Sequence, residues 1–314
     1  MISIVVPIYK SEFNIPDLIT QLNSVADYYS EEVEVVFVID GSPDRSFDLL
    51  QSKDIIKKFK SQLILLSRNF GALSAVQTGL FNARGRVIVV KAADCQEPVM
   101  LLTNLVDEIV NDRADIAVGV RDTREDAVTT RIFSAIYWAI FRRLGNDDVP
   151  RRGVDIFAIS KAVRDQIIVI DDNPAALVGL LYWVGFRRVE IGYDRIERKI
   201  GKSSWSFRKK AKYAIDSLTS FSGAPLVWLA VLGGVSAVIS VALSVTVMLR
   251  QLIWHQSPPG YTPIVLGIGV LMSSMMFGFA VLGAYVWRIA EDTRGRPSSI
   301  IAARLELDSN MSQS

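Results

Sequence analysis

Four short groups of polar and aromatic residues are the chemistry-bearing positions of the first third of the chain. They read PIYKSE at 7–12, DGSPD at 40–44, RNFG at 68–71 and KAADCQEP at 91–98, and each directly follows an apolar run. Carboxylates, amides, cations and rings in one set suit the binding of a nucleotide. No glycine precedes Gly41 and no Walker-type loop occurs, so the Gly-rich phosphate turns of dinucleotide-binding and P-loop folds are missing.

These groups need a scaffold that brings the ends of several strands together. Apolar, β-branched runs predict strands at 2–8, 33–39, 62–66, 86–90 and 116–118, and helical patterns lie between them at 15–28, 47–59, 73–83 and 100–111. This alternation predicts an α/β fold with a mainly parallel sheet wrapped by helices. Ligands bind at the carboxyl ends of such strands, so we expect the four groups to meet in one site.

Composition separates a soluble part from a membrane part. Half of the 314 residues are hydrophobic, and in residues 224–287 the one strong charge is Arg250. The formal net charge of +2 argues against general attraction to nucleic acid. A single cysteine, Cys95, excludes an internal disulfide and fits a reducing compartment. No signal peptide is visible, so we expect the N-terminal domain in the cytoplasm.

Two uncharged runs, 226–249 and 263–287, are each long enough to cross a ~30 Å hydrocarbon core as a helix. Basic residues crowd their outer flanks and the loop between them holds only Arg250, so the positive-inside rule places both termini in the cytoplasm, at the bacterial inner membrane. The predicted boundaries are a cytoplasmic domain at 1–204, a juxtamembrane helix at 205–223, spans at 224–250 and 263–287, an outer loop at 251–262 and a cytoplasmic tail at 288–314. A pair of buried core helices is the alternative.

The juxtamembrane segment 205–223 has the pattern of an amphipathic helix. Apolar residues recur at helical spacing from Trp205 to Phe221, and Lys209 and Lys212 fall on the other face. We expect this helix to lie on the inner leaflet, held by apolar burial and by anionic lipid. An ordinary helix of the soluble domain is the alternative.

The ordered set of motifs resembles the inverting GT-A glycosyltransferases, in the family that holds dolichyl-phosphate mannose synthase and the bacterial polyprenyl-phosphate (bactoprenol) glucosyltransferases. That family carries Pro-x-Tyr-Asn-Glu-Glu, Asp-Gly-Ser-x-Asp, Arg-Asn-x-Gly and Asp-x-Asp-Leu-Gln-Asp-Pro in this order, and the four groups above are similar to them. RKIGKS at 198–203 and YVWRIAE at 285–291 resemble its later motifs. The resemblance implies a Rossmann-like GT-A domain, then an interfacial helix and a two-helix transmembrane hairpin.

The resemblance also implies a reaction. A hexose is transferred to a polyprenyl phosphate such as undecaprenyl phosphate, with inversion at the anomeric carbon. The leading candidate for the donor is UDP-glucose. Because a nucleoside diphosphate leaves, catalysis would rest on positioning and on stabilisation of negative charge. The implied partners are a UDP-hexose, the lipid phosphate, the membrane and further copies of the chain, as in a tetramer. The motifs do not name the sugar or the glycan that finally receives it.

By the same resemblance, the site residues have assigned roles. Asp155 is a catalytic candidate, as a base or as a carboxylate that orients the substrate. Asp94 is the second catalytic candidate, and with Gln96 it would be a hard oxygen ligand of Mg²⁺ or Mn²⁺. The donor-binding candidates are Pro7, Tyr9, Glu12, Asp40, Asn69 and Gly71, and the phosphate-binding candidates are Arg121, Arg124, Arg198 and Ser203. Purely structural roles are open for several of them: a turn for Asp40, an N-cap for Asp94, and ion pairs for Arg121, Arg124 and Asp155.

One departure from the family pattern puts the metal in question. Ala92 stands where the family has the first Asp of its metal pair, and losing a carboxylate weakens a hard-cation site. A hypothesis is that Lys10 or Lys91 adds compensating positive charge. The alternative function is a catalytically degenerate paralogue that acts as a membrane scaffold in a glycan-assembly complex. Ala92 is its best argument, and the retained site residues argue against it: Asp40, Asp94, Gln96, Asp155 and Arg198.

Overall fold

The computed structural model describes residues 1–52, 58–121, 154, 156–170, 174, 177–196, 235, 238–239, 242, 261–293, 295 and 297–307. The chain divides into two compact units. The first, which we call the sheet unit, comprises Met1–Ser217 and Pro297–Ser314. The second, the helical unit, comprises Leu218–Arg296.

The sheet unit is built on one eight-stranded sheet with the order β7-β5-β6-β4-β1-β2-β3-β8. Its parallel pairs are β1 with β2, β1 with β4, β2 with β3, and β5 with β7. Strand β6 runs antiparallel to both of its neighbours, and β8 runs antiparallel to β3. The strands are β1 (Ile2–Ile8), β2 (Val33–Ile39), β3 (Lys60–Leu66), β4 (Val87–Val90), β5 (Ile116–Arg121), β6 (Ile156–Ser160), β7 (Arg188–Tyr193) and β8 (Ile301–Leu307).

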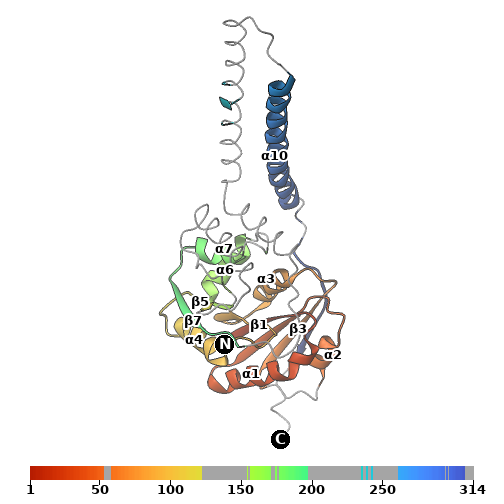
Figure 1. Cartoon of the computed structure of the whole chain (residues 1–314). Helices are drawn as coiled ribbons and strands as arrows, with labels where there is room; N and C mark the ends of the chain where they lie inside the picture. The colour runs from red at the N-terminus through yellow and green to blue at the C-terminus, as the bar shows by residue number, and fades with distance from the viewer. Residues whose placement is uncertain are drawn as a thin grey trace, which may run out of the picture. The chain divides into compact units, whose positions relative to one another are not determined.

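Helices cover both faces of this sheet. Helix α1 contacts both α2 and α4 along one face, and α3 and α6 contact each other along the other (Figure 1). The helical elements of the sheet unit are a short 3-10 helix at Glu12–Asn14, α1 (Ile15–Tyr28), α2 (Ser46–Gln51), α3 (Ala72–Asn82), α4 (Val99–Val110), α6 (Lys161–Ile170) and α7 (Leu177–Trp183).

The central strands are apolar throughout because both of their faces are buried. In β1, Ile4 joins the core cluster that also holds Leu18 and Leu22 of α1. On the other face Val5 contacts α3, where a Cβ on Gly79 would lie only 2.2 Å from the Val5 Cγ1 atom. Continuous apolar runs are the mark of parallel strands covered on both sides, and the predicted α/β class with a mainly parallel sheet is confirmed in this mixed form.

Three strands were not predicted. β6 joins β4 to β5, β7 lies at one edge, and β8 lies at the other edge. Both edge strands are half-exposed and alternate apolar with polar residues, a weaker signal than a buried run. β8 falls inside the segment 288–314 that the sequence suggested as a tail. Helix α2 is shorter than predicted, and residues 53–57 lie outside the described residues.

In the helical unit, α10 (Tyr261–Thr293) covers the whole of the predicted second span. Among the described residues, none of the helices combines the length and the apolar character that crossing a membrane requires. The predicted juxtamembrane helix at 205–223 lies outside the described residues. So does nearly all of the predicted first span at 224–250.

Candidate active site at the carboxyl edge of the sheet

Asp40, at the end of β2, is the most enclosed of the predicted donor-binding residues. Its side chain is buried, and its two carboxylate oxygens accept backbone N–H bonds from Phe70 at 2.6 Å and Gly71 at 2.9 Å. The Asn69 amide donates to the Asp40 carbonyl at 3.3 Å. Asp40 therefore fixes the loop after β3 against the end of β2. The same carboxylate is the candidate acceptor for a nucleotide N–H, so its position decides both the loop geometry and the proposed donor contact.

The next residue, Gly41, cannot be replaced without moving that loop. Its φ is +55°, and a Cβ there would lie 2.3 Å from the Arg68 carbonyl carbon and 2.5 Å from the Asn69 nitrogen. Both the left-handed backbone and the close approach demand glycine. The DGS sequence is therefore a turn, and it is also the contact that holds the RNFG loop in place.

Asp44 joins the turn after β2 to the turn after β1. Its carboxylate accepts from the Ser42 and Ser46 hydroxyls at 2.6 and 2.9 Å and from the Glu12 N–H at 3.0 Å. In return, the Glu12 carboxylate accepts the Arg45 N–H at 3.1 Å. Burial pushes the pKa of Asp44 upward, but the hydrogen bonds outweigh it and hold the pKa below its usual value.

Lys91 and Glu97 form a buried ion pair at the end of β4. Both side chains are only 1% exposed, and the ammonium lies 3.7 Å from the Glu97 carboxylate and 3.5 Å from the Glu97 carbonyl. Burial raises the pKa of Glu97, and the Lys91 charge opposes that shift. Lys91 is thus committed to an internal partner, which speaks against the hypothesis that it neutralises a bound ligand.

The predicted metal motif is attached to the segment that follows β7. The Asp94 carboxylate lies 3.4 Å from the Arg195 guanidinium. The Gln96 side chain donates to the Ile196 carbonyl at 3.1 Å, and the Ile196 N–H donates to the Gln96 carbonyl at 2.9 Å. Sequence reasoning missed Arg195. The available signal was the period-2 alternation of residues 188–193, which marks a strand whose following residues reach the same edge.

These residues do not make a good divalent metal site. Ala92 has no side-chain oxygen, the Asp94 carboxylate is paired with a guanidinium, and Gln96, whose side-chain N–H donates to the Ile196 carbonyl, offers only a neutral amide oxygen. A hard divalent cation prefers several anionic oxygens. Over the described residues, no group of three or more His, Cys, Asp or Glu side chains is placed to hold a metal ion.

Rings and cations line the turns beside these carboxylates. The Lys10 ammonium lies 5.5 Å from the centre of the Tyr9 ring, and the Arg68 guanidinium lies 4.1 Å from that of Phe70. Lys10 is exposed, so it remains available to a ligand. Burial raises the pKa of Cys95 to about 11, so this thiol is not a nucleophile at neutral pH.

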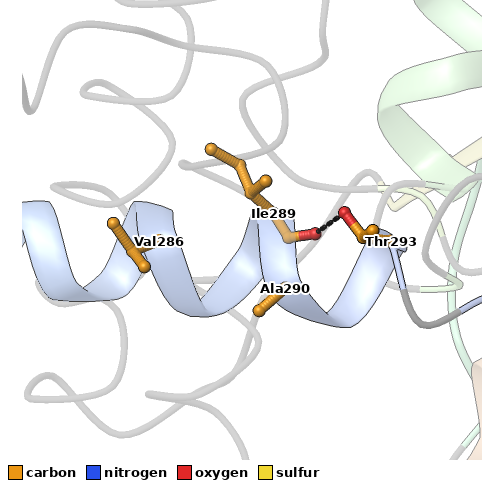
Figure 2. A pocket seen from close by; sticks show the side chains of 4 residues that line it. All are labelled: Val286, Ile289, Ala290 and Thr293. Carbon is orange, nitrogen blue, oxygen red and sulfur yellow. Dashed lines mark hydrogen bonds between the residues drawn. The ribbon is translucent and has the colours of Figure 1, made fainter.

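The structure gathers most of the predicted site at one edge of the sheet. Pro7, Tyr9 and Glu12 lie at the end of β1 or just after it, and Arg121 ends β5. The remaining candidates lie outside the described residues, namely Arg124, Asp155, Arg198 and Ser203. Figure 2 shows a separate hollow on α10, lined by Val286, Ile289, Ala290 and Thr293. Among these four residues the hydroxyl is that of Thr293, and it donates to the Ile289 carbonyl at 2.7 Å.

Comparison with known proteins decides the family. The family model described as "Glycosyl transferase family 2" matches residues 3–168, more than half of the chain. The chain belongs to glycosyl transferase family 2. As a family 2 glycosyltransferase it has an α/β domain that carries its motifs on consecutive strand ends, and the matched residues include the turns around Asp40 and Asp94.

Two relatives of this glycosyltransferase align over nearly its whole length. The "Prophage bactoprenol glucosyl transferase homolog" of Escherichia coli K12 is 28% identical over 301 residues, covering 96% of this chain and 98% of the relative. The "Undecaprenyl-phosphate 4-deoxy-4-formamido-L-arabinose transferase" of Shewanella sediminis is 26% identical, covering 94% and 90%.

A solved mannosyltransferase of Pyrobaculum calidifontis, in complex with GDP-Man and Mn²⁺, is 15% identical to this glycosyltransferase. It covers 94% of this chain and 79% of its own, with a TM-score of 0.45. Similarity at that level gives no ground for assigning that protein's ligands to this chain.

Proposed function

We propose that this glycosyltransferase transfers a hexose from a nucleotide sugar to a polyprenyl phosphate such as undecaprenyl phosphate. The leading candidate for the donor is UDP-glucose. The product would be a lipid-phosphate sugar that serves as donor for cell-envelope glycan modification. The observation that carries the proposal is the end-to-end similarity to a bactoprenol glucosyl transferase homolog and to an undecaprenyl-phosphate transferase. Family 2 membership and the α/β domain support a GT-A assignment.

The site chemistry is consistent with this reaction. The acceptor phosphate is already ionised at neutral pH, so its oxygen attacks the anomeric carbon without needing a strong base. The bond from that carbon to the diphosphate breaks, and the nucleoside diphosphate leaves with the electron pair. Asp40 and the turns it holds would position the nucleotide, and cations at the strand ends would stabilise the leaving group.

We propose further that the protein is anchored in the bacterial inner membrane with its sheet unit and both termini in the cytoplasm. Two uncharged runs and their basic outer flanks support this topology. Helix α10 carries large apolar side chains at exposed positions, Ile264, Met275, Phe279 and Val286 among them, which suits a surface covered by lipid or by another helix. The small residues in the two runs suit packing between copies of the chain, as in a tetramer.

The direct test is synthesis of the lipid product. The full chain, purified in detergent, is incubated with undecaprenyl phosphate and a panel of UDP-glucose, UDP-galactose, UDP-N-acetylhexosamines and GDP-mannose, each with Mg²⁺, Mn²⁺ or chelator. Mass spectrometry should show a hexosyl-phosphoryl-polyprenol with one donor. Asp40→Asn, which turns an acceptor oxygen into a donor facing an N–H, should lower the rate at least about tenfold, whereas exposed Asp48→Asn should not.

A second candidate is the catalytically degenerate scaffold, and Ala92 is the observation that favours it. The same assay separates the two. No product from any donor, with Ala92→Asp restoring one, would favour the scaffold and reject the enzyme. Product from the natural sequence would reject the scaffold.

A further inference from the structure

The residues of the metal motif and of the segment after β7 do not fit a metal-dependent site, and this bears on how the diphosphate of the donor is bound. A motif with two carboxylates carries two negative charges, which a divalent cation balances. In this chain the motif keeps one carboxylate, Asp94, and a guanidinium already lies 3.4 Å from it. One carboxylate and one Arg are neutral together, so this motif is balanced without a metal ion.

Arg195 is held in this position by the fold. It follows β7, whose last residue Tyr193 pairs in register with Arg121 at the end of β5, so the chain emerges at the carboxyl edge of the sheet. The reciprocal bonds between Gln96 and Ile196 then fasten the residue next to Arg195 onto the motif loop. The guanidinium is thus preorganised at the motif, which is what stabilisation of a developing negative charge requires.

Arg195 also has donor groups left for a ligand. Its contact to Asp94 uses Nη2, and its buried Nε has no acceptor within the part of the chain that the structure describes. Buried N–H groups of folded proteins normally have a partner, so an unmet one marks a place for an incoming oxygen. The planar guanidinium offers two parallel N–H groups that match the oxygens of a phosphate.

Lys91, the cation within the motif itself, cannot take this role. Lys91 lies at the start of the same motif, but its ammonium is only 1% exposed and is paired with Glu97.

We propose that Arg195 is a phosphate-binding residue that takes the place of the divalent metal, so that this chain binds the diphosphate of its donor without a metal ion. The inference rests on the proposed nucleotide-sugar donor. Asp94 then acts as a positioning residue that orients the guanidinium, while the freed diphosphate is stabilised by Arg195 as the bond to the sugar breaks.

The test is calorimetric binding of UDP to the full chain in detergent, with Mn²⁺ or with EDTA. The affinity of the natural sequence should change less than about threefold between the two conditions, and Arg195→Gln should weaken metal-free binding about 10- to 100-fold. The matched control is Arg187→Gln, an exposed Arg at the other end of β7 that pairs with Asp112 and Asp115. This control should bind UDP as the natural sequence does.

A double variant tests the exchange of charge directly. Ala92→Asp combined with Arg195→Gln restores the two carboxylates and removes the guanidinium, so it should bind UDP with Mn²⁺ and lose most of that binding in EDTA. If Arg195→Gln fails to fold, Arg195→Lys keeps the charge without the planar fork and should bind more weakly than the natural sequence but still without metal.

The outcomes are distinguishable from those of the proposed function. Binding of UDP and formation of the lipid product only with Mn²⁺ would leave the proposed function standing and overturn the role of Arg195. Metal-free binding that Arg195→Gln leaves within about twofold would overturn it as well. If UDP and GDP bind under no condition, the nucleotide-sugar donor and the role of Arg195 both fall.

Discussion

At the scale of single residues, the motif residues of this glycosyltransferase have both a structural role and a candidate ligand-binding role. Asp40 is a candidate nucleotide ligand and is also the acceptor that fixes the Phe70 and Gly71 amides. Gly41 permits the close approach that this bond requires. Geometry and the proposed chemistry depend on the same atoms here, so we expect a substitution to change both stability and activity.

Gly41→Ala should be more damaging than a comparable glycine change elsewhere. Its Cβ would meet the Arg68 and Asn69 backbone in addition to the strain of a positive φ. We expect a fall in Tm of about 5–10 °C and loss of UDP binding. Gly185→Ala, at φ +74° in open space, is the control and should cost about 2–4 °C. Equal losses for the two variants in a thermal melt would show that the close approach does not matter.

At the scale of elements, the site depends on bonds between turns. The turns after β1 and β2 are joined by Asp44 and Glu12, and the turn after β4 is joined to the end of β7 through Gln96 and Ile196. Each of these bonds spans two loops whose strands are set by the sheet. We call these joined turns at the carboxyl edge of the sheet the rim. The stability of the rim should respond to the charge state of the carboxylates that join the turns.

Asp44 gives this rim a predictable pH dependence. Its pKa is lowered in the folded protein, so its carboxylate stabilises the fold above the unfolded-state pKa, and this contribution is lost as the pH falls through the folded pKa. The difference in Tm between the natural sequence and Asp44→Asn should be full at pH 6 and should shrink at pH 3. A difference in melting temperature that is constant over this range would contradict the assigned hydrogen bonds.

Strand β8 protects the open edge of β3. The Ser67 N–H donates to the Ile300 carbonyl at 2.9 Å, and the Arg304 guanidinium donates at 2.6 Å to the Gln62 side chain. Gln62 in turn donates to the buried Glu34 carboxylate at 2.6 Å. An uncovered strand edge invites pairing with other chains, and β8 replaces the edge of β3 by one with the exposed charges of Arg304 and Glu306, so we expect β8 to stabilise the sheet unit and to reduce aggregation.

Removal of β8 should therefore be costly. A chain that ends at residue 296 keeps the helical unit but loses these bonds, and we expect its Tm to fall by about 5–15 °C with increased aggregation. The control ends at residue 307, which keeps all of β8 and removes only residues 308–314. Light scattering and a thermal melt compare the two. Equal Tm values and equal light scattering for the two chains would mean that pairing with β8 does not stabilise β3.

At the scale of the whole molecule, the sheet unit is formed from both ends of the chain. Residues after α10 return to pair with β3, so Pro297–Ser314 belongs to the same compact unit as Met1–Ser217. Because the intervening segment leaves the sheet unit and comes back to it, the proposed membrane segment has to cross an even number of times. This is consistent with the proposed hairpin, whose two ends lie on the same side of the membrane.

Cysteine labelling in intact cells tests this topology. In a Cys95→Ala background, Ser257→Cys lies in the proposed outer loop and Ser309→Cys lies in the proposed cytoplasmic tail. A membrane-impermeant maleimide should label the first and not the second, and both should react after the cells are permeabilised. Labelling of Ser309→Cys in intact cells, or of neither before permeabilisation, would reject the hairpin.

The sequence alone determined the central strands, the helices between them, and the placement of Asp40 and Asp94 at strand ends. These features depend on local periodicity, since a strand buried on both faces has to be apolar throughout. The tertiary structure alone decided the contacts of Arg195 with Asp94 and of Arg304 with Gln62, which join residues 101 and 242 positions apart. Local patterns carry no information about such distant pairs, because the sheet order, which no short segment specifies, determines which turns meet.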